Sequence, residues 1–339
     1  MEISFTGFHP EPNCGRGTLT ILYTSLITIF LSSWAALHLE TPRPDLKKRA
    51  AKVSHLTSKI FDCLISIISP DYSAADRISA TFRALRLRSA LRQIPGSWES
   101  FSLQQAFLVH NDGCRHVTPL NILPLAQSKR LAFKDFPSDE EIADRSKADK
   151  VVKLITISQC IWFGINTLYR LSRNYRTSPF EVFALGHAVS GIISLAAMLS
   201  CPQDIRIPFD ISTGDEDEDN DAEEEEMVFG WGVVLANLLL TALLLAGTWW
   251  YPFPSTEEMW LWRGFALSGP VPVIVFYLSD ATGASEKSHY LVHNIVYVLL
   301  LVVLICSRLG IIVLALMAFR RAPLDLYTKP DLSDYWPHF

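Results

Sequence analysis

Four ionisable side chains fall within long apolar runs of the sequence: Glu181, His187, Asp280 and Arg308. A charge is costly at membrane depth, so such a group usually faces a partner, a cavity or a pathway. A buried carboxylic acid can also deliver a proton to a bound substrate. Glu181, Asp280 and His187 are therefore the candidate catalytic residues.

The spacing of these residues predicts who their neighbours are. Glu181 and His187 are six residues apart, which places them on opposite sides of a helix at about 100° per residue. The two side chains should therefore contact different groups. An unpaired Arg308 would be expensive in an apolar stretch, so we expect it to pair with Glu181 or Asp280. The competing interpretation is that these charges form ion pairs with a purely structural role.

The composition indicates which elements must position these residues. Of 339 residues, 49% are hydrophobic and only 19% are charged, and the mean hydropathy is +0.21. The uncharged runs 18–39 and 227–250 are long enough to cross a hydrocarbon core, which takes roughly 20 helical residues. A net charge of −5 disfavours a nucleic-acid binder, and six scattered cysteines disfavour a disulfide scaffold.

The predicted fold class is therefore all-α, an integral membrane bundle of five to seven transmembrane helices with a cytosolic helical loop. The predicted organisation is a lumenal N-terminus (1–17), a first span (18–39), a cytosolic loop (40–151), two apolar helices (152–200), an acidic linker (201–226), a C-terminal bundle (227–319) and a polar tail (320–339).

The orientation follows from basic residues, which favour the cytosolic side of a membrane. The cluster Arg43 to Lys52 outweighs Arg16, which places the N-terminus in the lumen or outside. Six spans (18–39, 152–170, 180–200, 227–250, 263–280 and 289–319) would then also put Arg320 and Arg321 outside, against the same rule. The segment 152–170 is the weakest candidate, because basic residues flank it at both ends.

Two segments of the loops have distinct compositions. Residues 73–94 predict an amphipathic helix rich in arginine, which lies on an anionic membrane face or packs on the rest of the loop. Just before it, Ile60 to Ser69 is apolar but too short to span, which favours a surface or re-entrant segment. Asp215 to Glu226 is almost continuous carboxylate and is expected to be solvated and disordered.

Motifs for known chemistry are absent: the chain has no phosphate-binding glycine loop, HExxH, CxxC or GxSxG. We therefore expect no metal and no cofactor. A cluster of residues of metal-ligand types has a spacing that matches no standard zinc site: His110, Asp112, Cys114 and His116.

Aromatic residues gather at the ends of the spans, where they form an interfacial belt or the wall of a substrate cavity. Pro270 and Pro272 break the fifth span near its middle, as in helices that border a pocket.

Five blocks of the sequence are distinctive: HPEPNCGRGT (9–18), IFLSSWAALHL (29–39), KADKVVKLITISQCIWFGINTLYRL (147–171), SPFEVFALGHA (178–188) and DYWPHF (334–339). In this order they resemble a large family of filamentous-fungal multi-pass membrane proteins. The resemblance supports a multi-pass topology, and we expect an endomembrane location, in the endoplasmic reticulum or another endomembrane. Some proteins of this kind occur beside secondary-metabolism enzymes, and fungal meroterpenoid pathways use small integral membrane cyclases.

Two functions remain open from the sequence. The first is a membrane-embedded isoprenoid (terpene) cyclase, in which a buried acid protonates a prenylated substrate and aromatic faces stabilise the carbocation. The second is a non-enzymatic scaffold or conduit whose buried charges are structural. An enzyme needs an acid open to a cavity, whereas a scaffold should pair every buried charge. The expected partners are the lipid bilayer and an apolar small molecule, with no nucleic acid.

Overall fold

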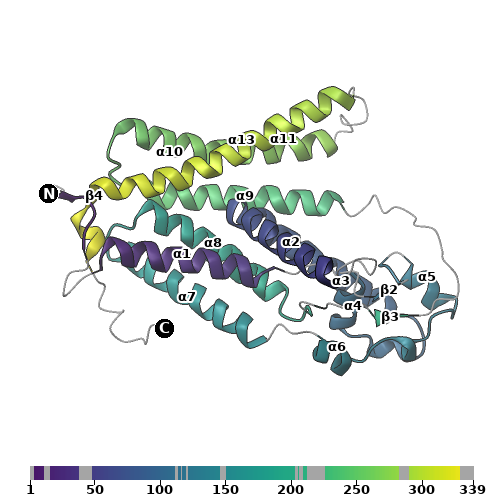
Figure 1. Cartoon of the computed structure of the whole chain (residues 1–339). Coiled ribbons are helices and arrows are strands. Elements are labelled where there is room, and N and C mark those ends of the chain that lie inside the picture. The colour runs from purple at the N-terminus through teal and green to yellow at the C-terminus, as the bar shows by residue number, and fades with distance from the viewer. Residues whose placement is uncertain are drawn as a thin grey trace.

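The structure is a computed structural model, and it describes residues 4–10, 16–37, 48–110, 114–115, 117–119, 121–145, 150–202, 205, 209–211, 226–281 and 290–328. The chain is almost wholly helical (Figure 1). The long helices are α1 (Thr18–Ala35), α2 (Lys48–Ile68), α3 (Pro70–Leu91), α7 (Lys150–Ser172), α8 (Pro179–Ala197), α9 (Glu226–Thr248), α10 (Thr256–Ser268), α11 (Pro270–Ala281) and α13 (Tyr290–Met317).

The remaining elements are short. The α-helices are α4 (Leu103–His110), α5 (Ile122–Gln127) and α6 (Asp139–Arg145), and the strands are β1 (Phe5–Thr6), β2 (Cys114–Arg115), β3 (Phe209–Asp210) and β4 (Ala322–Pro323). The 3₁₀ helices cover Ser97–Ser100, Phe133–Asp135, Ala318–Arg321 and Leu324–Tyr327. β1 pairs antiparallel with β4, and β2 pairs parallel with β3.

The long helices form an elongated bundle, and the short helices α4, α5 and α6 form a lobe at one end of it (Figure 1). We call this end the lobe end. The first and last described segments lie at the opposite end, which we call the terminal end, where β1 meets β4. The lobe has its own apolar core around Phe101, Phe107 and Ile122, whereas Ile21, Phe183 and Trp262 belong to the core of the bundle.

Four helical segments are long and apolar enough to cross a membrane: Thr18–Ala35, Val151–Ser172, Pro179–Ala197 and Ile295–Arg321. Gly232–Thr248 is apolar but shorter. Val151–Ser172 includes 152–170. The sequence made 152–170 the weakest candidate span, because basic residues flank it at both ends. The predicted all-α class is therefore confirmed, and four segments meet the length and composition of a span.

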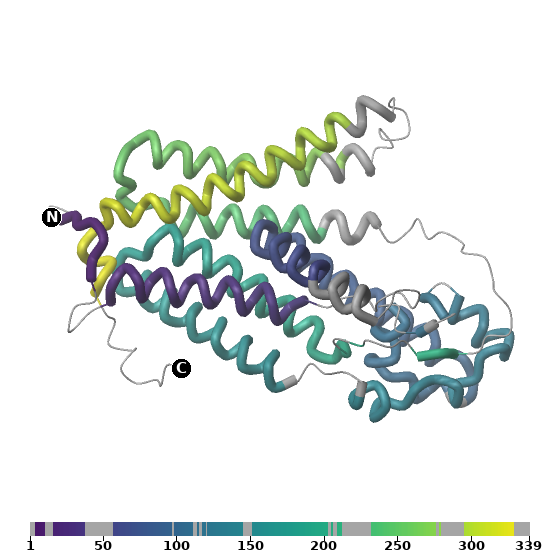
Figure 2. The backbone as a smooth tube through the Cα atoms, viewed as in Figure 1, coloured from purple at the N-terminus to yellow at the C-terminus, as the bar shows by residue number. Residues whose placement is uncertain are grey.

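The α2–α3 hairpin enters the bundle from the lobe end and returns to it (Figure 2). The helices are separated by Ser69 alone, and Pro70 occupies the first turn of α3, where its missing N–H costs nothing. α3 packs against α8 and α9, and α2 contacts α13. The short apolar segment Ile60–Ser69 thus lies at the end of one arm of a helical hairpin.

The predicted amphipathic helix 73–94 forms the greater part of α3, and its arginines divide between two roles. Arg83 donates to His110 Nε2 at 3.0 Å, and Arg92 donates to the carbonyl of Phe101 at 2.9 Å. Both contacts hold α3 against the lobe, which supports packing on the loop for these residues. Phe82, by contrast, leaves 65% of its surface exposed.

The acidic run Asp215 to Glu226 lies outside the described residues, apart from Glu226 at the start of α9.

Close helix contacts in the bundle depend on small residues. A Cβ added to Gly191 of α8 would lie 2.5 Å from Cβ and 3.2 Å from Cα of Ser32 in α1. No larger residue fits there without moving a backbone. Small residues at such a contact let two helices approach closely, as is common in membrane bundles.

Candidate functional site

Glu181 is tied down by the start of its own helix. Ser178 caps α8, its hydroxyl accepts from the Glu181 N–H at 3.0 Å, and Glu181 Oε2 accepts from the Ser178 N–H at 2.9 Å. This reciprocal arrangement is a capping box. The sequence signal for it is Ser178-Pro179-Phe180-Glu181, which fits the S-x-x-E pattern. Reading Glu181 only as a buried acid misses this local role.

Arg16 completes the surroundings of Glu181. Its Nη1 and Nη2 donate to Oε1 and Oε2 at 2.5 and 3.1 Å, in a bidentate pair whose Glu181 side chain is 3% exposed. Arg16 also donates through Nε to the carbonyl of Leu326 at 3.0 Å. Glu181 therefore joins the N-terminal segment and the C-terminal segment to α8. It is held as an anion by three donors, which suits a structural ion pair better than a proton donor.

Arg170 of α7 binds the C-terminal segment at the terminal end of the bundle. Its Nη1 donates to the carbonyl of Thr328 at 2.6 Å, and its Nη2 donates to the carbonyls of Leu326 and Arg176, both at 2.9 Å. The side chain is almost completely buried. A guanidinium shared among carbonyls fixes the path of the last described residues across the end of the bundle.

A second polar layer lies in the middle of the bundle, where the α2–α3 hairpin ends. His187 is the ninth residue of the nineteen-residue α8, and its Nε2 lies 2.9 Å from the carbonyl oxygen of Ile67. That carbonyl lies at the end of α2, where the helix can no longer supply every donor. With its Nε2 protonated, His187 donates to this carbonyl, so it supports the hairpin tip. Glu181 and His187 thus serve different neighbours, as their spacing predicts.

Arg308 of α13 is completely buried, and its carboxylate partner is Asp71. Arg308 Nη2 donates to Asp71 Oδ1 at 3.2 Å, and Asn237 Nδ2 of α9 donates to Asp71 Oδ2 at 2.5 Å. Of the two expected partners, Glu181 was wrong for this contact, because it binds Arg16 instead. The side chain of the other, Asp280 in α11, lies outside the described residues.

Two interruptions of helical structure meet at Arg308. One is the hairpin tip, because Asp71 is the second residue of α3. The other is the α10–α11 junction, where a Cβ on Gly269 would lie 3.6 Å from Arg308 Cζ. Pro270 cannot donate to the Ala266 carbonyl, which accepts from Thr241 Oγ1 at 3.3 Å instead. Proline thus breaks this segment, as predicted, but it borders a buried charge and not a pocket among the described residues.

The middle layer has unused hydrogen-bonding capacity. Arg308 Nε and Nη1 and Asn237 Oδ1 are buried and have no partner among the described residues. Sequence reasoning missed Asp71 and Asn237. Asp71 follows a short apolar run that could not span on its own, and a single asparagine in an apolar helix gives only a weak signal.

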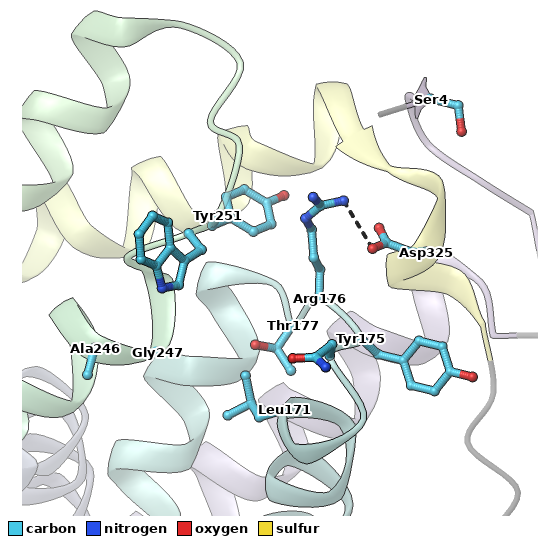
Figure 3. Close-up of a pocket in the computed structure, with 11 residues that line it drawn as sticks. Ser4, Leu171, Tyr175, Arg176, Thr177, Ala246, Gly247, Tyr251 and Asp325 are labelled. Carbon is cyan, nitrogen blue, oxygen red and sulfur yellow. Dashed lines mark hydrogen bonds and ion pairs between the residues drawn. The ribbon is translucent and has the colours of Figure 1, made fainter. Parts of the chain in front are cut away.

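A cavity of about 570 Å³ opens at the terminal end (Figure 3). Its wall combines the N-terminal segment, the loop between α7 and α8, the end of α9 and the C-terminal segment, with Tyr175, Arg176, Trp250, Tyr251 and Asp325 among the lining residues. Arg176 Nη1 donates to Asp325 Oδ2 at 3.0 Å across one side of it. Burial raises the pKa of the Tyr251 phenol above its usual range. This cavity brings aromatic rings and a carboxylate together, but neither Glu181 nor His187 lines it.

The aromatic residues near the ends of α9 and α10 have different environments. Trp250 and Trp260 are 86% and 65% exposed, as expected for an interfacial belt. Trp262 is fully buried and donates through Nε1 to Thr248 Oγ1 at 2.8 Å. Trp250 and Tyr251 also line the cavity, so both interpretations of the aromatic residues have support at different positions.

The ligand-type cluster near residue 110 has an ordinary structural explanation where it is described. His110 accepts from Arg83, and burial lowers its pKa to about 4, with the positive charge of Arg83 as a second cause. Burial raises the pKa of the Cys114 thiol to about 12. Asp112 and His116 lie outside the described residues. Among the residues that are described, no group of three or more His, Cys, Asp or Glu side chains could hold a metal ion.

Comparison with known proteins gives a single short match. A family model described as a family of unknown function, DUF8562, matches residues 273–339, which cover most of α11, α13 and the C-terminal segment. The match includes Arg308 and Asp325 but none of Asp71, Glu181 or Asn237. No curated protein and no solved structure matches the chain.

Proposed function

We propose that the chain is a multi-pass membrane protein that provides a path for a small polar or charged solute, with its centre at Arg308. In this proposal α1, α7, α8, α9, α10–α11 and α13 cross the bilayer, and α2–α3 is a re-entrant hairpin. Broken helices that meet at the middle of a membrane are typical of transporter binding sites, because they bring unsatisfied backbone and charged groups to one place.

The observation that carries this proposal is the meeting of the α2–α3 tip and the α10–α11 junction at one buried arginine. Charged side chains within membrane spans mark solute pathways in many proteins. Arg308 also keeps two donor nitrogens free among the described residues. The pairing of Glu181 with Arg16 further favours the conduit over an enzyme that uses Glu181 as its acid.

The test uses purified protein reconstituted in liposomes and measures the flux of protons, chloride, inorganic phosphate and amino acids. Wild type should pass at least one of these faster than empty liposomes. Asn237→Leu removes a polar group at the centre while leaving the Asp71–Arg308 pair, and it should reduce that flux at least tenfold. Leu238→Ala, next to it on an exposed face of α9, is the matched control and should not. Equal flux in wild type and empty liposomes contradicts the proposal.

A second candidate function, cyclisation of a prenylated substrate, is favoured by the aromatic wall of the terminal-end cavity. Both oxygens of Glu181 accept from donors, whereas Asp325 borders the cavity and has an unpaired Oδ1 among the described residues. Asp325 would therefore take the place of Glu181 as the acid, with the proton on Oδ1 while Oδ2 still accepts from Arg176. Microsomes containing the chain, supplied with epoxidised prenyl phenols, should then yield cyclic products that disappear in Asp325→Asn. Product formation in that variant at matched protein levels would remove this candidate. Localisation to an endomembrane remains part of both proposals.

A further inference from the structure

The terminal-end cavity is surrounded by buried polar atoms that lack partners. Thr177 Oγ1, the Tyr251 hydroxyl and Asp325 Oδ1 have no hydrogen-bond partner among the described residues. All three belong to residues that line the cavity (Figure 3). Buried polar atoms are nearly always hydrogen-bonded, and an unpaired one costs free energy unless water or a ligand satisfies it. Three such oxygens around one cavity indicate that a polar molecule in the cavity forms the missing hydrogen bonds.

The chemistry of these oxygens defines what that molecule must offer. Asp325 Oδ2 is occupied by Arg176, so its free Oδ1 can only accept from a donor. The hydroxyls of Thr177 and Tyr251 can each donate and accept. A hydroxyl group meets both demands, because it carries one donor hydrogen and two acceptor lone pairs.

The charges around the cavity favour an uncharged head group. Arg176 is paired with Asp325, and nearby Glu181 is paired with Arg16. Arg170, whose Nη1 and Nη2 donate to backbone carbonyls, is not among the residues that line the cavity. An additional charge on the ligand would therefore find no unpaired counter-charge among the lining residues.

The other part of the wall is apolar. Leu171 and Ala246 line it, together with Gly247 and the largely exposed indole of Trp250. This side adjoins the last turn of α9, which ends at Thr248. Apolar bodies of ligands are commonly bound by such surfaces, while a few polar groups fix their orientation.

From these features we infer that the cavity binds a neutral amphiphile whose head group carries hydroxyls and whose apolar body lies against Leu171, Ala246 and Trp250. The head would donate to Asp325 Oδ1 and bond the hydroxyls of Thr177 and Tyr251. This binding site stands apart from solute passage at Arg308 and requires no chemical turnover. The head could be phenolic or a sugar, which share the same hydroxyl chemistry.

The experiment measures binding to the full chain in lipid nanodiscs, with empty nanodiscs as background. The probes are pentadecylresorcinol, which has a phenolic head, and decyl glucoside, which has a sugar head. Pentadecylbenzene, with the same chain as the resorcinol but no hydroxyl, is the ligand control. At least one hydroxylated probe should bind and raise the melting temperature, and the alkylbenzene should bind at least tenfold more weakly than the resorcinol if the head is phenolic.

Two variants remove hydroxyls that have no partner in the described structure: Tyr251→Phe and Thr177→Val. Each should weaken binding by about fivefold to tenfold, the loss of one hydrogen bond, without lowering the melting temperature of the ligand-free protein. Tyr327→Phe is the matched control, because its hydroxyl bonds Thr18 Oγ1 at 3.0 Å and lies 3.3 Å from the Gly7 carbonyl. It should lower the melting temperature and leave binding unchanged.

Binding of the resorcinol alone or of the glucoside alone identifies the head group and supports the inference. The inference is overturned if neither probe binds, if the alkylbenzene binds as tightly as the resorcinol, or if both hydroxyl-deletion variants bind like wild type. It is also overturned if Tyr251→Phe and Thr177→Val destabilise the ligand-free protein as much as Tyr327→Phe, since their hydroxyls would then have partners within the chain. None of these results depends on flux through the bundle.

Discussion

Arg308 and Asp71 are 237 residues apart in the sequence and form a 3.2 Å ion pair in which 0% and 2% of the two side chains are exposed. The pair joins α13 to the first turn of α3, at the tip of the α2–α3 hairpin. A carboxylate near the N-terminus of α3 also interacts favourably with the helix dipole. This contact, together with His187 at the Ile67 carbonyl, is what holds the hairpin tip within the bundle.

Asp71→Ala should destabilise the protein by about 3–5 kcal/mol, because it leaves Arg308 buried without a counter-charge. Replacing both residues with apolar ones, Asp71→Leu with Arg308→Met, should recover most of that loss. Arg176→Gln is the control: it breaks a pair whose side chains are 31% and 35% exposed, and it should cost less than about 1 kcal/mol. Chemical denaturation in detergent measures all three. A loss no larger for Asp71→Ala than for Arg176→Gln would contradict the role of the buried pair.

Glu181→Gln should lower the stability by about 2 kcal/mol, since the neutral amide weakens a charge-assisted pair with Arg16. Exchanging the charges, Arg16→Glu with Glu181→Arg, should restore part of the loss relative to Glu181→Arg alone. The same denaturation assay provides the comparison. A Glu181→Gln protein as stable as wild type that has lost a measurable activity would instead identify Glu181 as a catalytic acid. Asp280→Asn belongs in the same series, as the other predicted acid.

A glycosylation acceptor introduced before residue 10 should be modified, and one near residue 140 should not, because the basic cluster Arg43 to Lys52 favours a cytosolic location of the loop. The β1–β4 pairing adds a further expectation. Phe5 lies opposite Pro323, so an acceptor after residue 321 should behave like the one before residue 10. Glycosylation is read as a mobility shift that glycosidase removes. Opposite results at the two ends of the chain would contradict the pairing of the termini.

Acidification should destabilise the lobe through His110. Its pKa in the folded protein is lowered to about 4, below the usual value of 6.5, so the unfolded chain binds the proton more readily between these values. Stability from this group is complete above about pH 6.5 and falls by up to about 1.4 kcal/mol per pH unit as the pH drops toward 4. His110→Gln should flatten this part of the stability profile. An identical slope in wild type and variant would show that other groups cause the acid sensitivity.

Gly191→Ala should destabilise the bundle by about 1–3 kcal/mol, because the new methyl group would overlap Ser32 and push α1 away from α8. Gly264→Ala is the matched control, since nothing lies within 4 Å of its added Cβ. Alanine has the higher helix propensity, so this control should be neutral or up to about 1 kcal/mol more stable. Thermal unfolding in detergent distinguishes the two. Equal effects would mean that α1 and α8 do not approach each other at Gly191.

The helical class follows from the sequence alone, as do the four segments that meet the length and composition of a span, although 227–250 and 263–280 were also predicted and do not meet them among the described residues. Apolar runs such as 18–39 and 180–200 leave few alternatives to a helix, because backbone groups in an apolar environment must bond within their own segment. The sequence also identified Glu181, His187 and Arg308 as unusual, since ionisable residues in such runs are rare. Their opposite helical faces followed from spacing alone.

Which charges pair depends on the tertiary structure and not on the local sequence. Asp71 lies in a polar stretch after a short apolar run, and nothing local indicates that a hairpin carries it to the middle of the bundle. Arg16 likewise reaches Glu181 only because the N-terminal segment crosses the end of α8. Pairing between residues 165 and 237 positions apart depends on how helices pack, and many partners satisfy the same charge requirement until packing selects one. The cavity at the terminal end has the same origin, because four separate parts of the chain form its wall.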